Sequence, residues 1–202
     1  MIFVNSFITF KFIKMKTRNF ISFTKIALAL LITVSSFAQK EKTTTVGGAP
    51  MYPSKNIIEN AVNSKDHTTL VAAVKAAGLV ETLQTAGPFT VFAPTNVAFA
   101  KLPKGTVETL LKPENLKTLQ TILTYHVLAG KFSSAQIVAA IKAGSGMASF
   151  KTVSGGTLKA MLKKGAVILT DENGASAKVT IADVNQSNGV IHVIDGVVTP
   201  KG

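Results

Sequence analysis

The sequence has 202 residues, with 22 basic and 10 acidic side chains, a net charge of +12 and no cysteine. The absence of cysteine excludes disulfide bonds, thiolate metal ligands, a cysteine nucleophile and the lipid-modified cysteine of a bacterial lipoprotein. Arg18 is the only arginine, and because proteins usually use arginine to read base edges and to bind phosphate with two hydrogen bonds, nucleic acid is not an expected partner.

The N-terminal 38 residues have the pattern of a secretory signal peptide. Every charged residue before position 39 is basic, and an uncharged run that is apolar except for Thr33 follows from Ile26 to Val34. Ser36 and Ala38 place small residues where a signal peptidase accepts them, so we predict cleavage after Ala38. Met15 begins a compact basic segment and is an alternative translation start.

A retained membrane anchor is the alternative for this segment. Phe20 to Ala38 is mostly apolar, but Lys25 interrupts it and leaves this run of nine residues, whereas about 20 are needed to cross a bilayer. We therefore predict export to the extracellular space, the cell surface or the periplasm, without a stable membrane span after cleavage. Because five of the 22 basic residues leave with the signal, the remaining 164 residues carry a net charge of +7.

Residues 39–53 are rich in threonine, glycine and proline and show no apolar period, which predicts a linker or an extended arm. A single domain is expected over residues 54–202, since a chain of this length can bury one core.

Helical signals dominate the first half of this domain. Asp66 is a candidate N-cap for a helix that ends at Gly78, and a short second helix is expected from Leu79 to Thr85. The apolar residues of the first helix are spaced by four and three: Leu70, Val74 and Ala77.

A buried strand is predicted from Phe89 to Ala93, ending at Pro94, and Thr95 is a candidate cap for the next helix. Pro113 suits the first position of a further helix. Its apolar face consists of Leu116, Leu119, Ile122, Leu123 and position 126.

A capping box and a series of strands follow. Ser133 and Gln136 have capping-box spacing for a helix that Gly144 closes. Beyond Ser149 the period becomes alternating, with turns at 171–174 and 187–189. The predicted strands are Thr157 to Leu162, Ala166 to Thr170, Lys178 to Val184 and Val190 to Ile194. Because the predicted helices come first along the chain and the predicted strands come last, we predict an α+β fold.

Catalytic and metal-binding patterns are absent. The sequence has no G-x-S-x-G, H-E-x-x-H, P-loop or G-x-G-x-x-G motif. The three histidines, His67, His126 and His192, lie 59 and 66 positions apart without clustered carboxylates. We therefore expect no catalytic residue, no metal site and no cofactor.

His126 and His192 are both predicted to lie in the core. His126 lies on the apolar face of its helix, so its nitrogens should bond to backbone or hydroxyl groups. The alternative is that Tyr125 and His126 are presented to a partner at the end of the helix. The strand that carries His192 is apolar on both faces, which predicts a central strand and a core histidine.

Three segments in order resemble the motifs of the fasciclin (FAS1) domain family. Residues 89–99 (FTVFAPTNVAF) resemble its first box, residues 188–195 (NGVIHVID) its second, and Tyr125-His126-Val127 the tyrosine-histidine motif between them. The resemblance extends from about Asn56 to Pro200. It assigns structural roles in the boxes to Thr95, Asn96, Phe99, Asn188, Gly189, His192 and Asp195.

The resemblance implies a β-strand wedge packed with short helices, and adhesion or extracellular binding without catalysis. A single signal with a single copy is similar to the small secreted fasciclin proteins of bacteria. In animal relatives the tyrosine-histidine motif is implicated in integrin binding. The matching positions are Tyr125, His126, Ile122, Leu123, Val127 and Leu128, so these are the candidate partner-binding residues.

Two residues depart from the family pattern, and we expect neither departure to change the fold. Asn96 stands where many relatives have aspartate, and it keeps an oxygen that can accept a backbone N–H. His67 stands where phenylalanine is frequent.

Two classes of function remain open. The favoured one is an adhesion or interaction module at the cell surface that binds matrix, polysaccharide or another protein, and lysine-rich patches would suit an anionic partner. The alternative is a small-ligand-binding protein or hydrolase whose site is assembled from scattered residues. A deep pocket with convergent polar groups would favour the alternative. No oligomeric state follows from the sequence.

Overall fold

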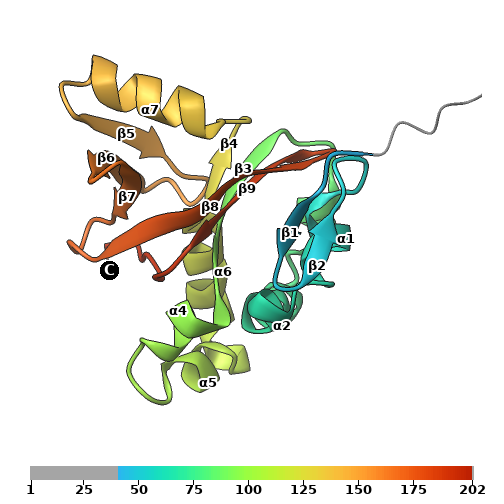
Figure 1. Ribbon diagram of the computed structural model, residues 1–202. Helices are drawn as coiled ribbons and strands as arrows, with labels where there is room; N and C mark the ends of the chain where they lie inside the picture. Colours follow the sequence, from blue (N-terminus) through green and yellow to red (C-terminus); the bar gives the residue numbers. More distant parts are fainter. Residues whose placement is uncertain (1–40, 202) are drawn as a thin grey trace, which may run out of the picture. The chain divides into compact units, whose positions relative to one another are not determined.

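The computed structural model describes residues 41–201 (Figure 1). The predicted signal peptide of residues 1–38, with its cleavage site and both candidate start positions, lies outside these residues. None of the helices between residues 41 and 201 is both long and apolar enough to pass through a bilayer.

A seven-stranded mixed sheet forms the centre of the domain. Its strand order is β4-β3-β9-β8-β7-β6-β5; β3 and β9 are parallel, and every other pair is antiparallel. The strands are β3 (Phe89–Pro94), β4 (Val127–Ala129), β5 (Met147–Lys151), β6 (Thr157–Lys163), β7 (Ala166–Thr170), β8 (Ser176–Gln186) and β9 (Gly189–Ile194). All four predicted C-terminal strands are present, and the α+β class is confirmed.

Helices cover this sheet in two groups. Figure 1 shows α7 lying along strands β5 to β7, while the other helices gather around the end of the sheet that contains β3, β4 and β9. The helices are α1 (Ile57–Ala61), α2 (Thr68–Ala76), α3 (Val80–Gln84), α4 (Asn96–Ala100), α5 (Thr106–Leu110), α6 (Leu116–Tyr125) and α7 (Ser134–Ala143). Short 3₁₀ turns at Lys65–His67 and Pro113–Asn115 precede α2 and α6.

The predicted caps of α4 and α7 are confirmed. Thr95 Oγ1 accepts a hydrogen bond from the backbone N–H of Ala98, and Ser133 and Gln136 form a reciprocal capping box. The predicted cap at Asp66 is wrong. Asp66 lies inside the 3₁₀ turn that precedes α2, and this turn is held by a 2.8 Å hydrogen bond between Ser64 Oγ and His67 Nδ1.

Residues 44–51 form a β-hairpin where the sequence predicts a linker or extended arm. Strands β1 (Thr44–Val46) and β2 (Ala49–Met51) pair antiparallel through Gly47 and Gly48, whose φ angles are +57° and +78°. Val46 and Met51 are buried against α1 and the sheet. Two apolar residues on one face of the hairpin thus fix it to the core. Two residues are too few to give a visible apolar period in the sequence.

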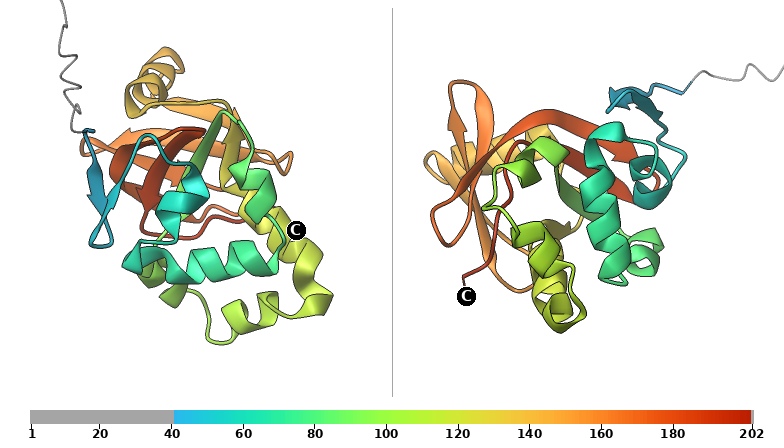
Figure 2. Two further views of the ribbon diagram at one scale, coloured as in Figure 1. Left: turned by 90° about the vertical axis from the view of Figure 1, so that its right-hand side faces the viewer. Right: turned by 90° about the horizontal axis from the view of Figure 1, so that it is seen from below.

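Strand β8 connects the two parts of the sheet. Its first residues pair with β7, and the rest pair with β9 through two register shifts, the second of which contains Asp183 at a φ of +57°. Bulges of this kind bend a strand and increase its twist. Figure 2 shows the result: β5 to β7 turn away from the helices that pack around β3 and β9.

Candidate functional site

Tyr125 is the most deeply buried member of the candidate partner-binding segment. Its side chain has 0% exposure and packs among Phe92, Leu128 and Ile194. The hydroxyl donates a 2.7 Å hydrogen bond to the carbonyl of Thr157 in β6. Burial raises the pKa of Tyr125 to about 12, so the hydroxyl stays a proton donor at physiological pH.

His126 joins the end of α6 to the C-terminal segment. Nδ1 lies 2.8 Å from the carbonyl of Ile122 and therefore carries the proton, while Nε2 accepts the backbone N–H of Val198 at 3.2 Å. Burial lowers the pKa of His126 to about 4, so the ring is neutral around pH 7. The prediction of a core histidine with satisfied nitrogens agrees with this geometry.

The rest of the segment is also enclosed. Leu123, Val127 and Leu128 are buried, and Ile122 is half-buried. Of the two alternatives, a core position and a surface that meets a partner, the structure shows the core position. Side chains that fill a core are not available to an extracellular partner, so the contact role predicted for Tyr125 and His126 is not supported by their burial.

Replacing Tyr125 with phenylalanine should lower the free energy of unfolding by about 1–2 kcal/mol, because the ring packing stays while the Thr157 carbonyl loses its donor. Urea denaturation measures the change. Tyr52→Phe is the matched control, since the Tyr52 side chain is half-buried, and we expect it to change the stability by less than about 0.5 kcal/mol. Equal effects of the two substitutions would contradict a structural role for the Tyr125 hydroxyl.

The first box fixes the start of α4 against α2. Asn96 Oδ1 accepts the backbone N–H of Thr69 at 3.0 Å, and Asn96 Nδ2 donates to the carbonyl of Lys65 at 2.9 Å. An aspartate here would keep only the first of these bonds, since a carboxylate accepts but does not donate. Thr95 caps the helix, and Phe99 is half-buried on it.

Asn188 in the second box holds two helices to the sheet. Its Oδ1 accepts the backbone N–H of Ile57 at 3.0 Å, and its Nδ2 donates to the carbonyls of Leu83 and Thr85 at 2.8 and 2.9 Å. The neighbouring Gly189 packs directly against the backbone of Phe89, where an added Cβ would collide with the carbonyl oxygen. This position therefore requires glycine for space.

His192 and Asp195 complete the second box. His192 Nε2 donates to the carbonyl of Phe132 at 2.9 Å, and Nδ1 accepts the backbone N–H of Asp183 at 3.3 Å. Burial lowers the pKa of His192. Asp195 Oδ1 accepts the backbone N–H of Lys178 at 2.7 Å, which links β9 to β8. Each box residue with a polar contact thus serves the fold.

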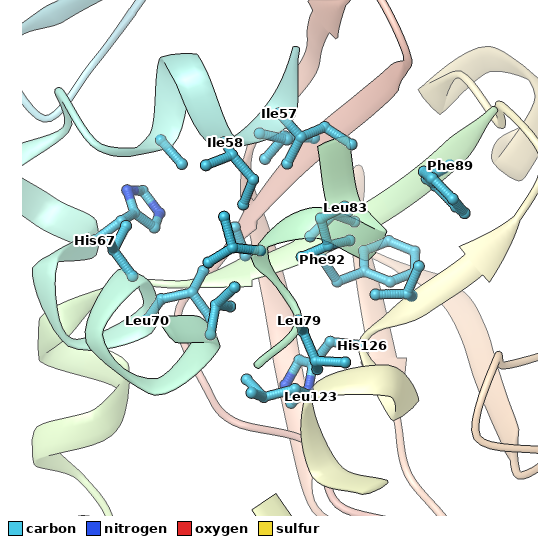
Figure 3. A pocket seen from close by; sticks show the side chains of 18 of the residues that line it. Ile57, Ile58, His67, Leu70, Leu79, Leu83, Phe89, Phe92, Leu123 and His126 are labelled. Carbon is cyan, nitrogen blue, oxygen red and sulfur yellow. The ribbon is translucent and has the colours of Figure 1, made fainter. Parts of the chain in front are cut away.

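An apolar cavity of about 90 Å³ lies between the sheet and helices α1 to α3 (Figure 3). No pattern in the sequence predicts this cavity, because its wall comes from helices and strands that are separate in the chain. Leu70, Leu79 and Leu83 border it and are only half-buried.

His67 stands at one end of this cavity. Its side chain is 4% exposed, and its Nε2 has no hydrogen-bond partner. Burial lowers the pKa of His67, and the backbone of Ala93 and the charge of Asp66 oppose this shift without cancelling it. The ring is therefore neutral at pH 7 and presents an unsatisfied polar atom.

His67 and His126 both border the cavity, but the nitrogens of His126 are taken up by the backbone of Ile122 and Val198, and His192 bonds to the backbone of Phe132 and Asp183. Across residues 41–201, no three histidine, aspartate or glutamate side chains group in a way that would hold a metal ion.

A second surface feature is the open face of strands β5 to β8, which we call the lysine face. Alternation buries the other face under α7. The ladder places the side chains of the lysine face in adjacent rows: Lys163 and Ala166; Met147, Met161, Ile168 and Lys178; Ser149, Lys159, Thr170 and Ser176; Lys151 and Thr157.

The lysine face is positive throughout. β5, β6, β7 and residues 176–180 of β8 contain no acidic residue, while all four lysines of the face are exposed. Glu172 lies at one end, where its carboxylate accepts the backbone N–H groups of Thr157 and Lys201. Since strands lie about 4.8 Å apart, the lysines are spread over a surface rather than gathered at a point.

Comparisons with known proteins agree with this architecture. The family model described as Fasciclin domain matches residues 65–200. Protein sll1483 of Synechocystis sp. is 44% identical over 182 residues, covering 90% of this chain and 94% of the relative. The immunogenic protein MPB70 of Mycobacterium bovis is 36% identical over 145 residues, covering 69% and 66%. A solved FAS1 domain pair from the insect cell adhesion molecule Fasciclin I matches with a TM-score of 0.64 at 16% identity, covering 78% of this chain and 58% of that structure.

Proposed function

Because this chain belongs to the fasciclin domain family and has the FAS1 fold, we propose that it is an exported, non-catalytic interaction module that uses the lysine face to bind an acidic polysaccharide. The lysine face is the observation that carries the proposal. Its four exposed lysines, interleaved hydroxyl groups and lack of acidic side chains complement a repeating polymer of negative charge.

The shape of the lysine face also favours a polymer over a small anion. The charges lie on separate strands of an open sheet, so no single group could touch all of them. Each exposed lysine contributes little alone, about 0.2–1 kcal/mol. Several such contacts along one chain give binding that is weak per contact and strongly dependent on salt.

Export is supported by the basic start and apolar run of residues 1–38. The relative MPB70 of Mycobacterium bovis is named as an immunogenic protein. A surface location for the chain agrees with an interaction role, and the titratable groups of residues 41–201 provide no arrangement that we would assign to catalysis.

Substituting three lysines of this face tests the proposal. We expect Lys151→Gln, Lys159→Gln and Lys178→Gln together to weaken binding to alginate about tenfold at 50 mM salt, the sum of three surface charge contacts. The matched control changes Lys75, Lys112 and Lys117 to glutamine, which removes the same net charge from exposed positions on or beside the helices. Binding can be measured by isothermal titration at two salt concentrations.

The two triple variants separate a defined surface from net charge. The control should lose less than about threefold. Equal losses in both variants would show that attraction depends on total charge alone, and binding that is unchanged between low and high salt would exclude an electrostatic contact.

A further inference from the structure

One buried polar atom distinguishes the apolar cavity from an ordinary packing defect. Among the buried side-chain nitrogens and oxygens of residues 41–201, His67 Nε2 is the one that lacks a hydrogen-bond partner. Buried polar groups in folded proteins are normally paired, because leaving one unpaired sacrifices its hydration without replacement. The missing partner of His67 therefore needs an explanation.

The other buried histidines show that this chain does satisfy imidazole rings. Both nitrogens of His126 and both nitrogens of His192 bond to backbone groups. In His67, Nδ1 is bonded to Ser64 Oγ at 2.8 Å, and the backbone of Ala93 lies near enough to the ring to raise its pKa, but Nε2 has no hydrogen bond of ordinary geometry. Figure 3 shows its ring at the border of the cavity, with a nitrogen on the side of the enclosed space.

The remaining wall of the cavity favours a ligand that is mostly apolar. It is formed mainly by aliphatic side chains and by Phe89 and Phe92, and Lys75, a lining lysine, is exposed to solvent. The volume of about 90 Å³ is somewhat smaller than the roughly 150 Å³ of an engineered apolar cavity that binds benzene. The leucines at its border are only half-buried, and a volume of this size suits one ring or a short branched chain.

We propose that this cavity binds a small uncharged apolar molecule that carries one hydroxyl group, and that the hydroxyl bonds to His67 Nε2. A neutral imidazole has one N–H, and Ser64 Oγ can either donate to Nδ1 or accept from it. Nε2 is accordingly a donor in one tautomer and an acceptor in the other. A hydroxyl both donates and accepts, so it satisfies Nε2 in either case.

Phenol and toluene form the matched pair of probes, since they differ by a hydroxyl in place of a methyl group of similar size. Both are titrated into the full chain, and binding is followed by the NMR shifts of the methyl groups of Ile57, Ile58 and Leu70, which line the cavity. The same titrations are made with His67→Phe, which keeps a ring of similar shape without nitrogen. The preference for phenol over toluene should fall about tenfold in the variant.

The preference for phenol over toluene is compared between the unsubstituted protein and His67→Phe. This comparison cancels the difference in hydration between phenol and toluene. An unchanged preference would overturn the role of His67, and methyl groups that do not shift with either probe would overturn the site itself. Benzoate tests the absence of charge, because tighter binding of benzoate than of phenol would show that the site takes an acid.

A measurement on the unsubstituted protein covers the case in which His67→Phe fails to fold. Phenol should shift the ¹⁵N resonance of His67 Nε2, whereas toluene should not. The nitrogens of His192, which does not line the cavity, serve as the internal control, because their partners are already supplied by the backbone. Phenol-induced shifts at His67 and His192 alike, or at neither, would contradict the proposed contact. The cavity and the lysine face share no residue, so a negative result for one proposal does not affect the other.

Discussion

Replacing Asn188 with aspartate is expected to lower the free energy of unfolding by about 3–5 kcal/mol. The amide now donates to the carbonyls of Leu83 and Thr85 while its oxygen accepts from Ile57. A carboxylate keeps the acceptor but turns both donors into an oxygen that faces two carbonyl oxygens in a site that is 5% exposed. The buried charge has no partner to offset its loss of hydration.

Asn185→Asp is the control for this substitution, because it makes the same chemical change three positions away. Asn185 is exposed, and its side chain donates only to the nearby carbonyl of Asp183, so we expect a loss below about 1 kcal/mol. Guanidinium denaturation of both variants gives the comparison. Similar losses at the two positions would argue that Asn188 does not hold α1 and α3 to the sheet.

Acidification from pH 7 to pH 4.5 is expected to remove about 2–3 kcal/mol of stability through His126. Its pKa is about 4 in the folded protein and 6.5 when exposed, so the unfolded state binds more protons between these values. The stability is therefore complete above pH 6.5 and declines as the pH falls toward 4. His67 and His192 also have lowered pKa values and act in the same direction.

His126→Gln isolates this contribution. Glutamine is uncharged at every pH in the range, and its amide can both donate and accept, as the bonds to Ile122 and Val198 require. Urea unfolding at half-unit intervals should give a flatter curve for the variant than for the wild-type protein. Parallel curves would show that His126 binds its proton equally in the folded and unfolded states.

Local signals were sufficient for the elements that depend on local chemistry. The Ser133 and Gln136 capping box, the Thr95 cap and the turn before Gly174 were predictable because their hydrogen bonds join residues a few positions apart. The core position of His126 followed from helical spacing in the same way.

Elements that depend on distant partners were missed. β4 has only three residues, and it is a strand because β3 pairs with it. β5 alternates weakly and becomes an edge strand by pairing with β6. The hairpin of β1 and β2 depends on Val46 and Met51 finding a core made elsewhere.

The two candidate sites differ in the same respect. The predicted strand from Thr157 to Leu162 has two alternating faces, but only the position of α7 shows that the side with Lys159 stays open. The cavity had no signal at all, because residues of four helices and six strands must assemble before its wall exists.

The parallel pairing of β3 with β9 has a consequence for the time course of folding. Each residue of β3 lies opposite a residue 100 positions later, from Phe89 with Gly189 to Pro94 with Ile194. Closing so long a loop before any ladder bond is gained slows folding. A ribosome must therefore have synthesised the chain as far as residue 194 before the centre of the sheet can assemble, so a nascent chain that ends before β9 has no folded state built on that pair.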